Sequence, residues 1–296
     1  MNNIKNTFSI HDFELLTGIK AHTIRIWEKR YAILNPSRQN RNVRFYNLND
    51  LQKILNLSLL YNQGFKISKI AKLSDKELNE TVSGTSLKDV SHCHIINNMI
   101  VAMYTYDEAK FDENYKLQIE KMSFKELFID TFIPLFEHIG ILWQTDSLKP
   151  ANEHFISNLI TQKIILNIAS LEKEKNDGPI NIIFLPEQEI HEIGLLFLYY
   201  DLKLRNKNVI YLGKSIPFDN LLDLNNQYDN INWISAFTLD KPKESKDKIF
   251  EQYNELLQEN KNTFQLIGHI WSSYKKTNTN ERLLFFNNIR DIIPLL

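Results

Sequence analysis

The chain has 296 residues, of which 43% are hydrophobic and 24% charged, and one cysteine, Cys93. The length leaves room for two or three domains, the composition is that of ordinary globular protein, and a single cysteine excludes an internal disulfide. No run reaches the roughly 18 apolar residues of a membrane span, and the start of the chain lacks the apolar core of a signal peptide. We therefore expect a cytoplasmic protein without a membrane partner.

Charge is unevenly distributed along the chain. The formal net charge is −1 overall, which is not typical of a nucleic-acid-binding protein. Residues 1–80, however, hold eight Lys and five Arg against seven Asp or Glu, a net charge of +6, so the remaining residues carry −7. A basic N-terminal part on an acidic body indicates that only the N-terminal part meets phosphate. The alternative is a random distribution of surface charge.

The first segment, residues 1–73, begins with two short helices. Phe8 to Leu16 predicts the first, with Ser9 as its N-cap. Ala21 to Lys29 predicts the second, after a break at Thr17-Gly18. Two short helices joined by a tight glycine-containing turn are typical of the helix-turn-helix motif.

The next residues predict a wing. Alternation on either side of residues 40–42 indicates a small β-hairpin, in which asparagine tolerates a left-handed turn. An amphipathic helix capped by Asn49-Asp50 then runs to about Tyr61, and residues 67–73 make one more short helix. Residues 74–88 follow as a polar linker whose composition is that of a hinge.

Beyond the linker, the spacing of apolar residues changes once along the chain. Residues 89–175 contain little glycine or proline and carry apolar residues at helical spacing, which predicts a four-helix bundle. In residues 176–296, compact apolar runs alternate with helical stretches, which predicts a doubly wound, Rossmann-like parallel sheet with helices on both faces. The expected strands begin at Ile180, Val209, Trp233 and Phe264, and the expected helices cover 190–204, 219–226 and 245–259. The fold class is therefore multidomain, α and α/β.

The N-terminal segment carries the runs TGIKAHTIRIWEKRYAILNPSR and RFYNLNDL, and in them it resembles the MerR family of transcriptional regulators. The shared features are Thr17-Gly18, Arg25 in the second helix, Pro36-x-Arg38 after it and Arg44-x-Tyr46 in the wing. Asn40 and Asn42 stand where that family commonly has glycine. The resemblance covers about the first 73 residues and implies a dimer on inverted-repeat operator DNA.

The residue types support DNA reading independently of the resemblance. Polar and basic groups at the start of a recognition helix can meet base edges, and arginines on a wing can grip the flanking phosphates. The predicted DNA-binding residues are Lys20, His22, Thr23, Arg25, Arg30, Tyr31, Arg38, Arg41, Arg44 and Tyr46. Two alternatives stay open: the arginines form a solvated face, and Trp27, Tyr31 and Tyr46 are core aromatics, which we favour for Trp27.

The sharpest motif in the C-terminal segment runs from Glu189 to Gly194. It follows the first expected strand and opens the next helix, and ligands of doubly wound sheets bind at the carboxyl ends of strands. We expect Glu189 to orient the imidazole of His191, and Gly194 to let the helix approach a bulky group. The alternative for His191 is a helix cap or a solvent-facing side chain.

This motif resembles the Asp-x-His-x-x-Gly of cobalamin-binding domains, with Glu in place of Asp. The resemblance implies that His191 is the lower axial ligand of cobalt. Ser235 stands near the spacing at which that family has a serine beside the buried nucleotide tail, and Gly268 stands in place of the first glycine of its Gly-Gly. Three departures accompany these matches: Phe237 replaces the leucine of Ser-x-Leu, His269 replaces the second glycine, and Gln144 stands where light-sensing relatives have histidine.

The bundle segment carries a second match. Trp143 is followed after nine residues by Glu153-His154, which resembles the Trp-x9-Glu-His pattern of cobalamin-dependent MerR-type photoreceptor regulators. The resemblance implies that Trp143 covers the upper face of the corrin and that Glu153 and His154 line the upper site. The alternatives are a bundle-core tryptophan and an ordinary exposed pair. His92 and His94 flank Cys93, but alternating helix residues point to different sides, which excludes a metal site there.

Together these patterns predict a DNA-binding transcription regulator, not an enzyme, controlled by adenosylcobalamin or methylcobalamin docked between the bundle and the α/β domain. Dependence of this control on light is a further alternative. Its expected partners are operator DNA, cobalamin and further copies of itself in a dimer or tetramer. One alternative is a regulator that has lost cobalamin and senses another small molecule or a protein. Another is a corrinoid methyl-carrier enzyme, which the DNA-binding segment argues against.

Overall fold

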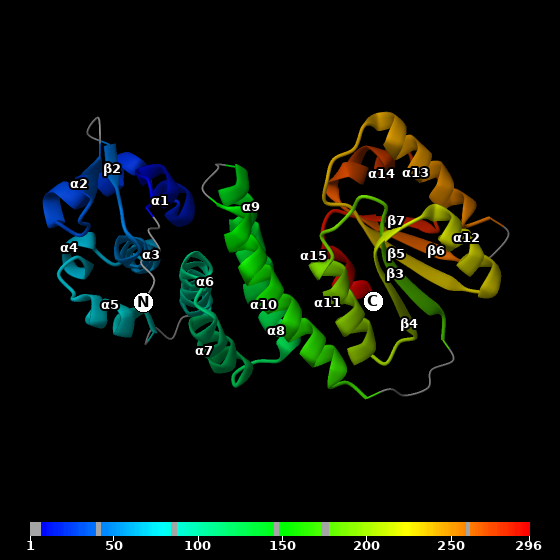
Figure 1. Ribbon diagram of the computed structural model, residues 1–296, viewed down its shortest axis with the longest axis horizontal. Coiled ribbons are helices and arrows are strands. Elements are labelled where there is room, and N and C mark those ends of the chain that lie inside the picture. The colour runs from blue at the N-terminus through cyan, green and yellow to red at the C-terminus, as the bar shows by residue number, and fades with distance from the viewer. Residues whose placement is uncertain (1–6, 40–42, 84–87, 145–147, 173–177, 259–260) are drawn as a thin grey trace. The chain divides into compact units, whose positions relative to one another are not determined.

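The computed structural model describes residues 7–39, 43–83, 88–144, 148–172, 178–258 and 261–296. The chain forms two compact units, Met1–Ile160 and Thr161–Leu296, and the boundary falls within one long helix, α10 (Pro150–Ala169) (Figure 1). Among the described helices, none combines the length and the apolar character that crossing a bilayer requires.

The N-terminal part of the first unit forms the predicted winged helix-turn-helix. Ser9 caps the first helix in a capping box, in which its hydroxyl accepts a hydrogen bond from the backbone of Asp12 and the Asp12 carboxylate accepts one from the backbone of Ser9. Gly18 ends that helix in a left-handed conformation, with φ of 70°. The elements are α1 (Ile10–Thr17), α2 (Ala21–Tyr31), β1 (Ser37–Gln39), β2 (Val43–Phe45), α3 (Leu48–Asn62) and α4 (Ile67–Ile70). β1 and β2 pair antiparallel, which confirms a wing, while its predicted turn at 40–42 lies outside the described residues.

The predicted hinge at 74–88 is wrong over most of its length. Residues Asp75–Ser83 form helix α5, which packs against α3 and α6 (Lys88–Thr105). The reason is that Leu78 and Val82, four residues apart, share one helix face and are both fully buried. Two apolar residues at the correct spacing therefore outweigh an otherwise polar composition.

The middle of the chain is helical, as predicted. Within the described residues it holds four helical runs, because a short helix, a π-helical turn and a longer helix are continuous: α8 (Phe124–Leu127), η1 (Phe128–Phe132) and α9 (Ile133–Gln144). In the π-helical turn the backbone N–H of Ile133 bonds to the carbonyl of Phe128, five residues earlier. The other runs are α6, α7 (Glu108–Ile119) and α10.

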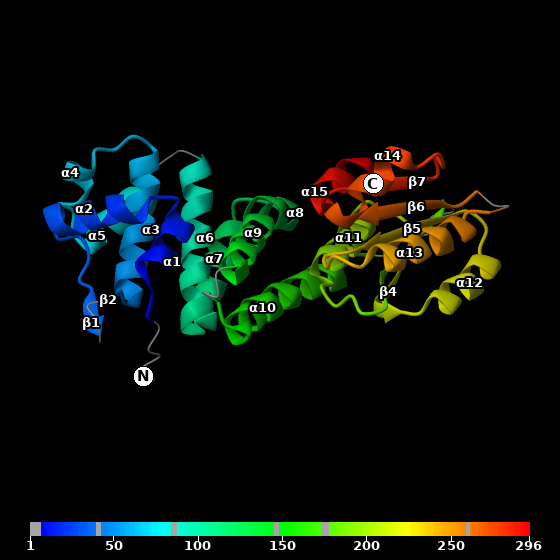
Figure 2. The same cartoon turned by 90° about the horizontal axis from the view of Figure 1, so that it is seen from above.

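Helix α6 joins the winged module to the bundle within the first unit. Figure 2 shows α6 lying alongside α3, and these two helices are in extensive contact. The ring of Phe8, just before α1, meets the ring of Tyr104 on α6 edge-on at 4.9 Å between centroids. Such aromatic pairs prefer this geometry and bury large apolar areas, so the two parts share one core.

The second unit is the predicted parallel sheet, with one strand more than expected. Its strand order is β4-β3-β5-β6-β7, and every neighbouring pair is parallel. The strands are β3 (Ile180–Pro186), β4 (Val209–Ile216), β5 (Ile231–Ala236), β6 (Thr263–Ile267) and β7 (Leu283–Phe286). The connection after β3 leads to β4 on one side of it, whereas the connection after β5 leads to β6 on the other side. The strand order therefore reverses between β3 and β5, and this gap is the topological switch point where ligands of such sheets bind.

Helices cover both faces of this sheet (Figure 1). On one face, side chains of three helices pack with Trp233 and Phe264 in a single large core. These helices are α12 (Phe218–Gln227), α13 (Lys243–Glu255) and α14 (Ser272–Thr277). On the other face, α11 (Ile193–Leu204) approaches α15 (Ile289–Ile292) so closely that a methyl group added at Gly194 would meet Ile289 at 3.3 Å.

Candidate functional site

Helix α2 presents basic side chains to solvent, together with Ile26, which is 55% exposed. Ile24 and Trp27 are buried, which confirms the core interpretation of Trp27. The predicted DNA-binding residues Lys20, His22, Arg25 and Arg30 are exposed at or on this helix, and Thr23 and Tyr31 are half-buried. The surface that α2 offers to a partner is therefore basic and polar, as a recognition helix requires.

The start of α2 lacks a side-chain cap of its own, and Glu14 of α1 compensates. The carboxylate of Glu14 accepts a hydrogen bond from the backbone of Ala21 and lies 3.2 Å from the ammonium of Lys20. The Lys20 contact, followed by the Ala21 bond, lowers the pKa of Glu14. These contacts fix the angle between the two helices of the motif.

The wing is tied to α2 through one carboxylate that sequence reasoning missed, Glu28. Nε of Arg44 donates to one oxygen of Glu28 at 2.9 Å, and the hydroxyl of Tyr46 donates to the other at 2.8 Å. Tyr46 is fully buried, and burial together with the Glu28 bond raises the pKa of its hydroxyl. This favours the core alternative for Tyr46, whereas Arg44 keeps a third of its side chain exposed.

Of the other two wing arginines, the structure describes the backbone position of Arg38. Arg38 lies on β1 directly opposite Arg44 on β2, so the backbone brings two arginines to the same point of the hairpin. Arg41 lies outside the described residues.

In the second unit, the loops after β3 and β5 meet over the switch point. Glu189, after β3, is fully buried and accepts two hydrogen bonds from the loop after β5. The hydroxyl of Thr238 donates to it at 2.9 Å, and the backbone N–H of Leu239 donates at 3.3 Å. Oγ1 of Thr238 also lies 2.8 Å from Nδ1 of the exposed His191.

This chain of contacts defines the tautomer of His191. A hydroxyl has one proton, and the buried carboxylate of Glu189 can only accept. The proton of Thr238 therefore goes to Glu189, and its oxygen must accept the N–H of His191 Nδ1. In the neutral imidazole this arrangement puts the lone pair on Nε2, which is the nitrogen that a metal would then meet.

One sequence expectation for this motif needs correction. The motif is expected to open a helix, but α11 begins only at Ile193, because Glu189 folds inward and leaves the intervening residues in a loop. Between Glu189, which is expected to orient the imidazole, and His191 stands Thr238, which contacts both. Thr238 was missed because its partners lie nearly fifty residues earlier; its one signal is a hydroxyl side chain just past the end of a strand.

Two further expected cofactor residues of this unit are Ser235 and Gly268. Ser235 is fully buried on β5, close to Tyr253 of α13. Gly268 adopts φ of 140°, and a Cβ there would run into the carbonyl oxygen of Phe237. The close approach of the chain at Phe237 thus accounts for this glycine without a ligand. The side chain of His269 is exposed and does not crowd the interior.

In the first unit, the three expected upper-site residues are available at the surface. Trp143 is 42% exposed near the end of α9, which argues against a bundle-core role. Glu153 and His154 lie in the first turn of α10, where Nδ1 of His154 is 2.7 Å from the Glu153 carboxylate. Ser157 donates a hydrogen bond to the same carboxylate at 2.5 Å. The described residues hold no group of three or more His, Cys, Asp or Glu side chains that could bind a bare metal ion.

Two family models match the chain in consecutive segments. Residues 8–77 match the MerR HTH family regulatory protein, which corresponds to α1 through the start of α5. Residues 95–166 match a B12 binding domain, which corresponds to most of α6 through α10. The boundaries agree with the division into a winged module and a bundle.

Whole-chain comparisons agree with both matches. The chain is 26% identical over 225 residues to the HTH-type transcriptional repressor CarH of Myxococcus xanthus, covering 73% of this chain and 74% of that protein. It is 24% identical over 214 residues to the repressor CarA of the same organism, covering 71% and 69%. Among solved structures, the monomethylamine corrinoid protein of Methanosarcina barkeri superposes with a TM-score of 0.57 at 12% identity, covering 68% of this chain and 96% of that one. This likeness confirms the fold class.

Proposed function

We propose that this chain, which joins a MerR helix-turn-helix segment to a B12 binding segment, is a DNA-binding transcription regulator controlled by cobalamin. The observation that carries the cobalamin part is the free Nε2 of His191, prepared by the bond from Nδ1 to Thr238. The similarity to two transcriptional repressors along some 70% of the chain supports the regulatory part.

The residues around His191 fit the lower side of a corrinoid. Neutral imidazole is a ligand that cobalt accepts, and the buried Glu189 holds the relay that keeps the proton on Nδ1. Ile190 and Leu239, beside His191 and Thr238 in the chain, are 62% and 48% exposed. Large apolar side chains exposed around a ligating group suit an apolar macrocycle, because its binding would remove them from water.

When bound, the corrinoid would supply a cobalt centre, which His191 would hold. We propose Trp143, Glu153 and His154 as further contacts to the corrinoid, because they are exposed or half-buried on the first unit. The upper ligand of cobalt, adenosyl or methyl, is part of the proposal, as is any response to light. In both cases this chain would contribute the imidazole of His191 to hold the metal and the indole of Trp143 to contact the corrin.

We assign DNA binding to α2 and the wing. Lys20, His22, Thr23, Arg25 and Arg30 would face the major groove or its edges, because they line the solvent side of a short helix that begins after a tight turn. Arg38, Arg41 and Arg44 would meet the flanking phosphates. We propose a homo-oligomer, a dimer or tetramer, as the DNA-binding form. Cobalamin controls it by binding one oligomeric arrangement more tightly than another.

The alternative from another class is a corrinoid methyl-carrier enzyme. The superposition on a corrinoid protein does not support it, because such a likeness shows the fold alone. The MerR segment and the regulator relatives argue for a regulator without enzymatic activity. A regulator that senses something other than cobalamin remains the alternative within that class.

The test is retention of corrinoid by the purified full-length protein. The protein is incubated in the dark with adenosylcobalamin or methylcobalamin, desalted, and examined by visible absorbance and gel filtration. We expect retained corrinoid with a histidine-coordinated spectrum and a changed elution volume. His191→Ala should lose the histidine-coordinated spectrum while its circular dichroism stays that of wild type. A variant spectrum identical to wild type would remove His191 as the ligand, and no retained corrinoid would remove cobalamin as the effector.

A further inference from the structure

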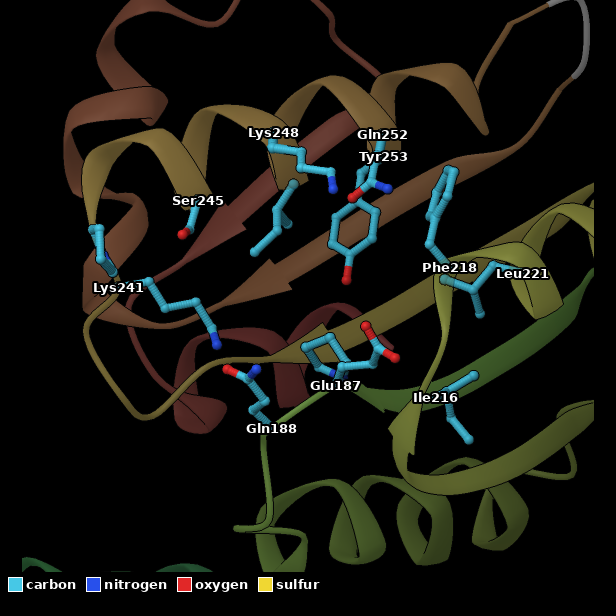
Figure 3. A pocket seen from close by; sticks show the side chains of 13 residues that line it. Glu187, Gln188, Ile216, Phe218, Leu221, Lys241, Ser245, Lys248, Gln252 and Tyr253 are labelled. Atoms are coloured by element: carbon cyan, nitrogen blue, oxygen red, sulfur yellow. The ribbon is translucent and has the colours of Figure 1, made fainter.

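A pocket of about 320 Å³ lies on the sheet face covered by α12 and α13, away from the face on which α11 meets α15 (Figure 3). Its base is apolar and is formed by Phe218, Leu221, Ile249 and the ring of Tyr253. Its volume is within the range of small-molecule sites, which are mostly apolar with a few convergent polar groups.

The rim of this α12/α13 pocket carries several polar side chains. Among the described residues, none of these side chains makes a hydrogen bond or an ion pair: Glu187, Gln188, Lys241, Ser245, Lys248 and Gln252. Figure 3 shows the ammonium groups of Lys241 and Lys248 directed inward and the hydroxyl of Tyr253 pointing toward Glu187 and Gln188. Two unpaired ammonium groups against one carboxylate make the rim cationic.

The backbone at the start of α13 adds partial positive charge to the rim. Helix α13 begins at Lys243, directly after Pro242, and has no side-chain hydrogen bond at its N-cap. The backbone N–H groups of its first turn therefore lack a side-chain acceptor there. Pro242 and Ser245, at this end of the helix, both line the pocket. A helix N-terminus carries partial positive charge and favours anions. Tyr253 is buried, and its phenol ring and hydroxyl offer an aromatic wall with one polar end.

We propose that the α12/α13 pocket binds a small organic anion with an apolar body, whose acidic group lies between Lys241 and Lys248. The apolar base takes the body of the ligand, and the amides and hydroxyls of the rim supply further hydrogen bonds. Glu187 disfavours ligands with several negative charges, so the pocket selects a monoanion.

The pocket shares two of its loops with the contacts that join Glu189, Thr238 and His191. Glu187 and Gln188 directly precede Glu189, and Lys241 follows Leu239 by two residues. A ligand that pulls on either loop therefore moves the residues that hold the imidazole of His191. The regulatory meaning of this link rests on the proposed function, because His191 is there the cobalt ligand, and the anion would then act as a second effector.

The experiment uses the full-length protein without corrinoid and two fluorescent probes, anilinonaphthalene sulfonate and its neutral analogue phenylnaphthylamine. We expect the sulfonate to bind at least tenfold more tightly than the neutral probe. Lys241→Met and Lys248→Met should each weaken sulfonate binding roughly tenfold, because each removes a charge-assisted contact and keeps the apolar stem. Lys243→Met is the matched control, since this exposed lysine lies on the same helix outside the pocket.

Two further measurements separate the possible outcomes. Ser245→Trp, at an exposed lining position, should block the pocket and abolish sulfonate binding without disturbing the core. The ¹⁵N signals of the His191 ring should shift when the sulfonate is added to wild type and not to Ser245→Trp. Equal binding of the neutral probe, or equal effects of Lys243→Met and Lys248→Met, would overturn the anion site. Binding without a His191 shift would overturn the link, and neither result depends on cobalamin.

Discussion

Oγ1 of Thr238 lies 2.8 Å from Nδ1 of His191, and because that hydroxyl donates its proton to Glu189 it must accept from the imidazole. One threonine thus transmits the charge of a buried carboxylate to an exposed ring. We expect Thr238→Val to lose the preference for the Nδ1–H tautomer, because valine keeps the shape and removes both hydrogen bonds. The ¹⁵N shifts of His191 in the corrinoid-free protein measure this directly.

Thr238→Ser is the matched variant, since it keeps the hydroxyl, and we expect it to behave like wild type. Thr238→Val should also lower the free energy of unfolding by about 1–3 kcal/mol, the cost of leaving a buried acceptor under-satisfied. If the valine variant shows the same tautomer as wild type, the relay is not what orients the ring.

A second prediction concerns the wing. Arg44→Ala should weaken operator binding by about 1–3 kcal/mol. It should also reduce, by about one, the magnitude of the slope of log affinity against log salt concentration, as expected for a lost phosphate contact. Lys76→Ala on α5 is the control for a simple loss of charge, because that lysine is only paired with Glu80 along its own helix. Equal losses in both variants, measured by fluorescence anisotropy across a salt series, would take Arg44 out of the interface.

A third prediction concerns the joint between wing and helix. Glu28→Gln should keep the hydrogen bonds to Arg44 and Tyr46 in part and remove the charge, so Arg44 is held less firmly. The hydrogen bonds to a charged acceptor are worth roughly 1.5–3 kcal/mol, so we expect a measurable drop in the urea midpoint. An unchanged midpoint would show that the wing does not depend on this carboxylate.

A fourth prediction tests whether α5 is part of the folded core. Leu78→Ala should lower the free energy of unfolding by about 2–5 kcal/mol, because the side chain is fully buried between helices. Glu80→Ala, at an exposed position of the same helix, should change it by less than about 0.5 kcal/mol. Similar small effects in both variants would restore the interpretation of this segment as a hinge.

A fifth prediction concerns Gly268. Alanine there should destabilise the second unit by about 1–3 kcal/mol or more, since its Cβ would collide with the carbonyl of Phe237 at a φ that side chains rarely adopt. Thermal unfolding measures it. A neutral effect would mean that the loop after β5 moves aside, and space for a ligand would then exist beside Phe237.

Local signals were predictable from the sequence, whereas contacts between distant segments were not. Ser9 and Asp12 form a capping box within four residues, and the strands of the sheet are continuous apolar runs. β7 was missed because Leu283–Phe286 is short and lies among Asn, Glu and Arg residues that give no strand signal. Thr238 and Glu28 were missed because their roles exist only through partners on other elements. The motif at His191 was found through a resemblance, and its geometry required the fold.

The π-helical turn at Phe128–Phe132 has a consequence for how the chain tolerates change. Such a turn holds one residue more than the α-helix needs, and each residue of an α-helix turns its successor by about 100°. Deleting one residue there would restore a regular helix from α8 to α9 and leave Trp143 on the same side, because the wider turn already absorbs the rotation of the extra residue. Two homologues that differ by that single residue would therefore expose the same face of the helix beyond it, so the turn lets the chain take up an insertion without moving its surface.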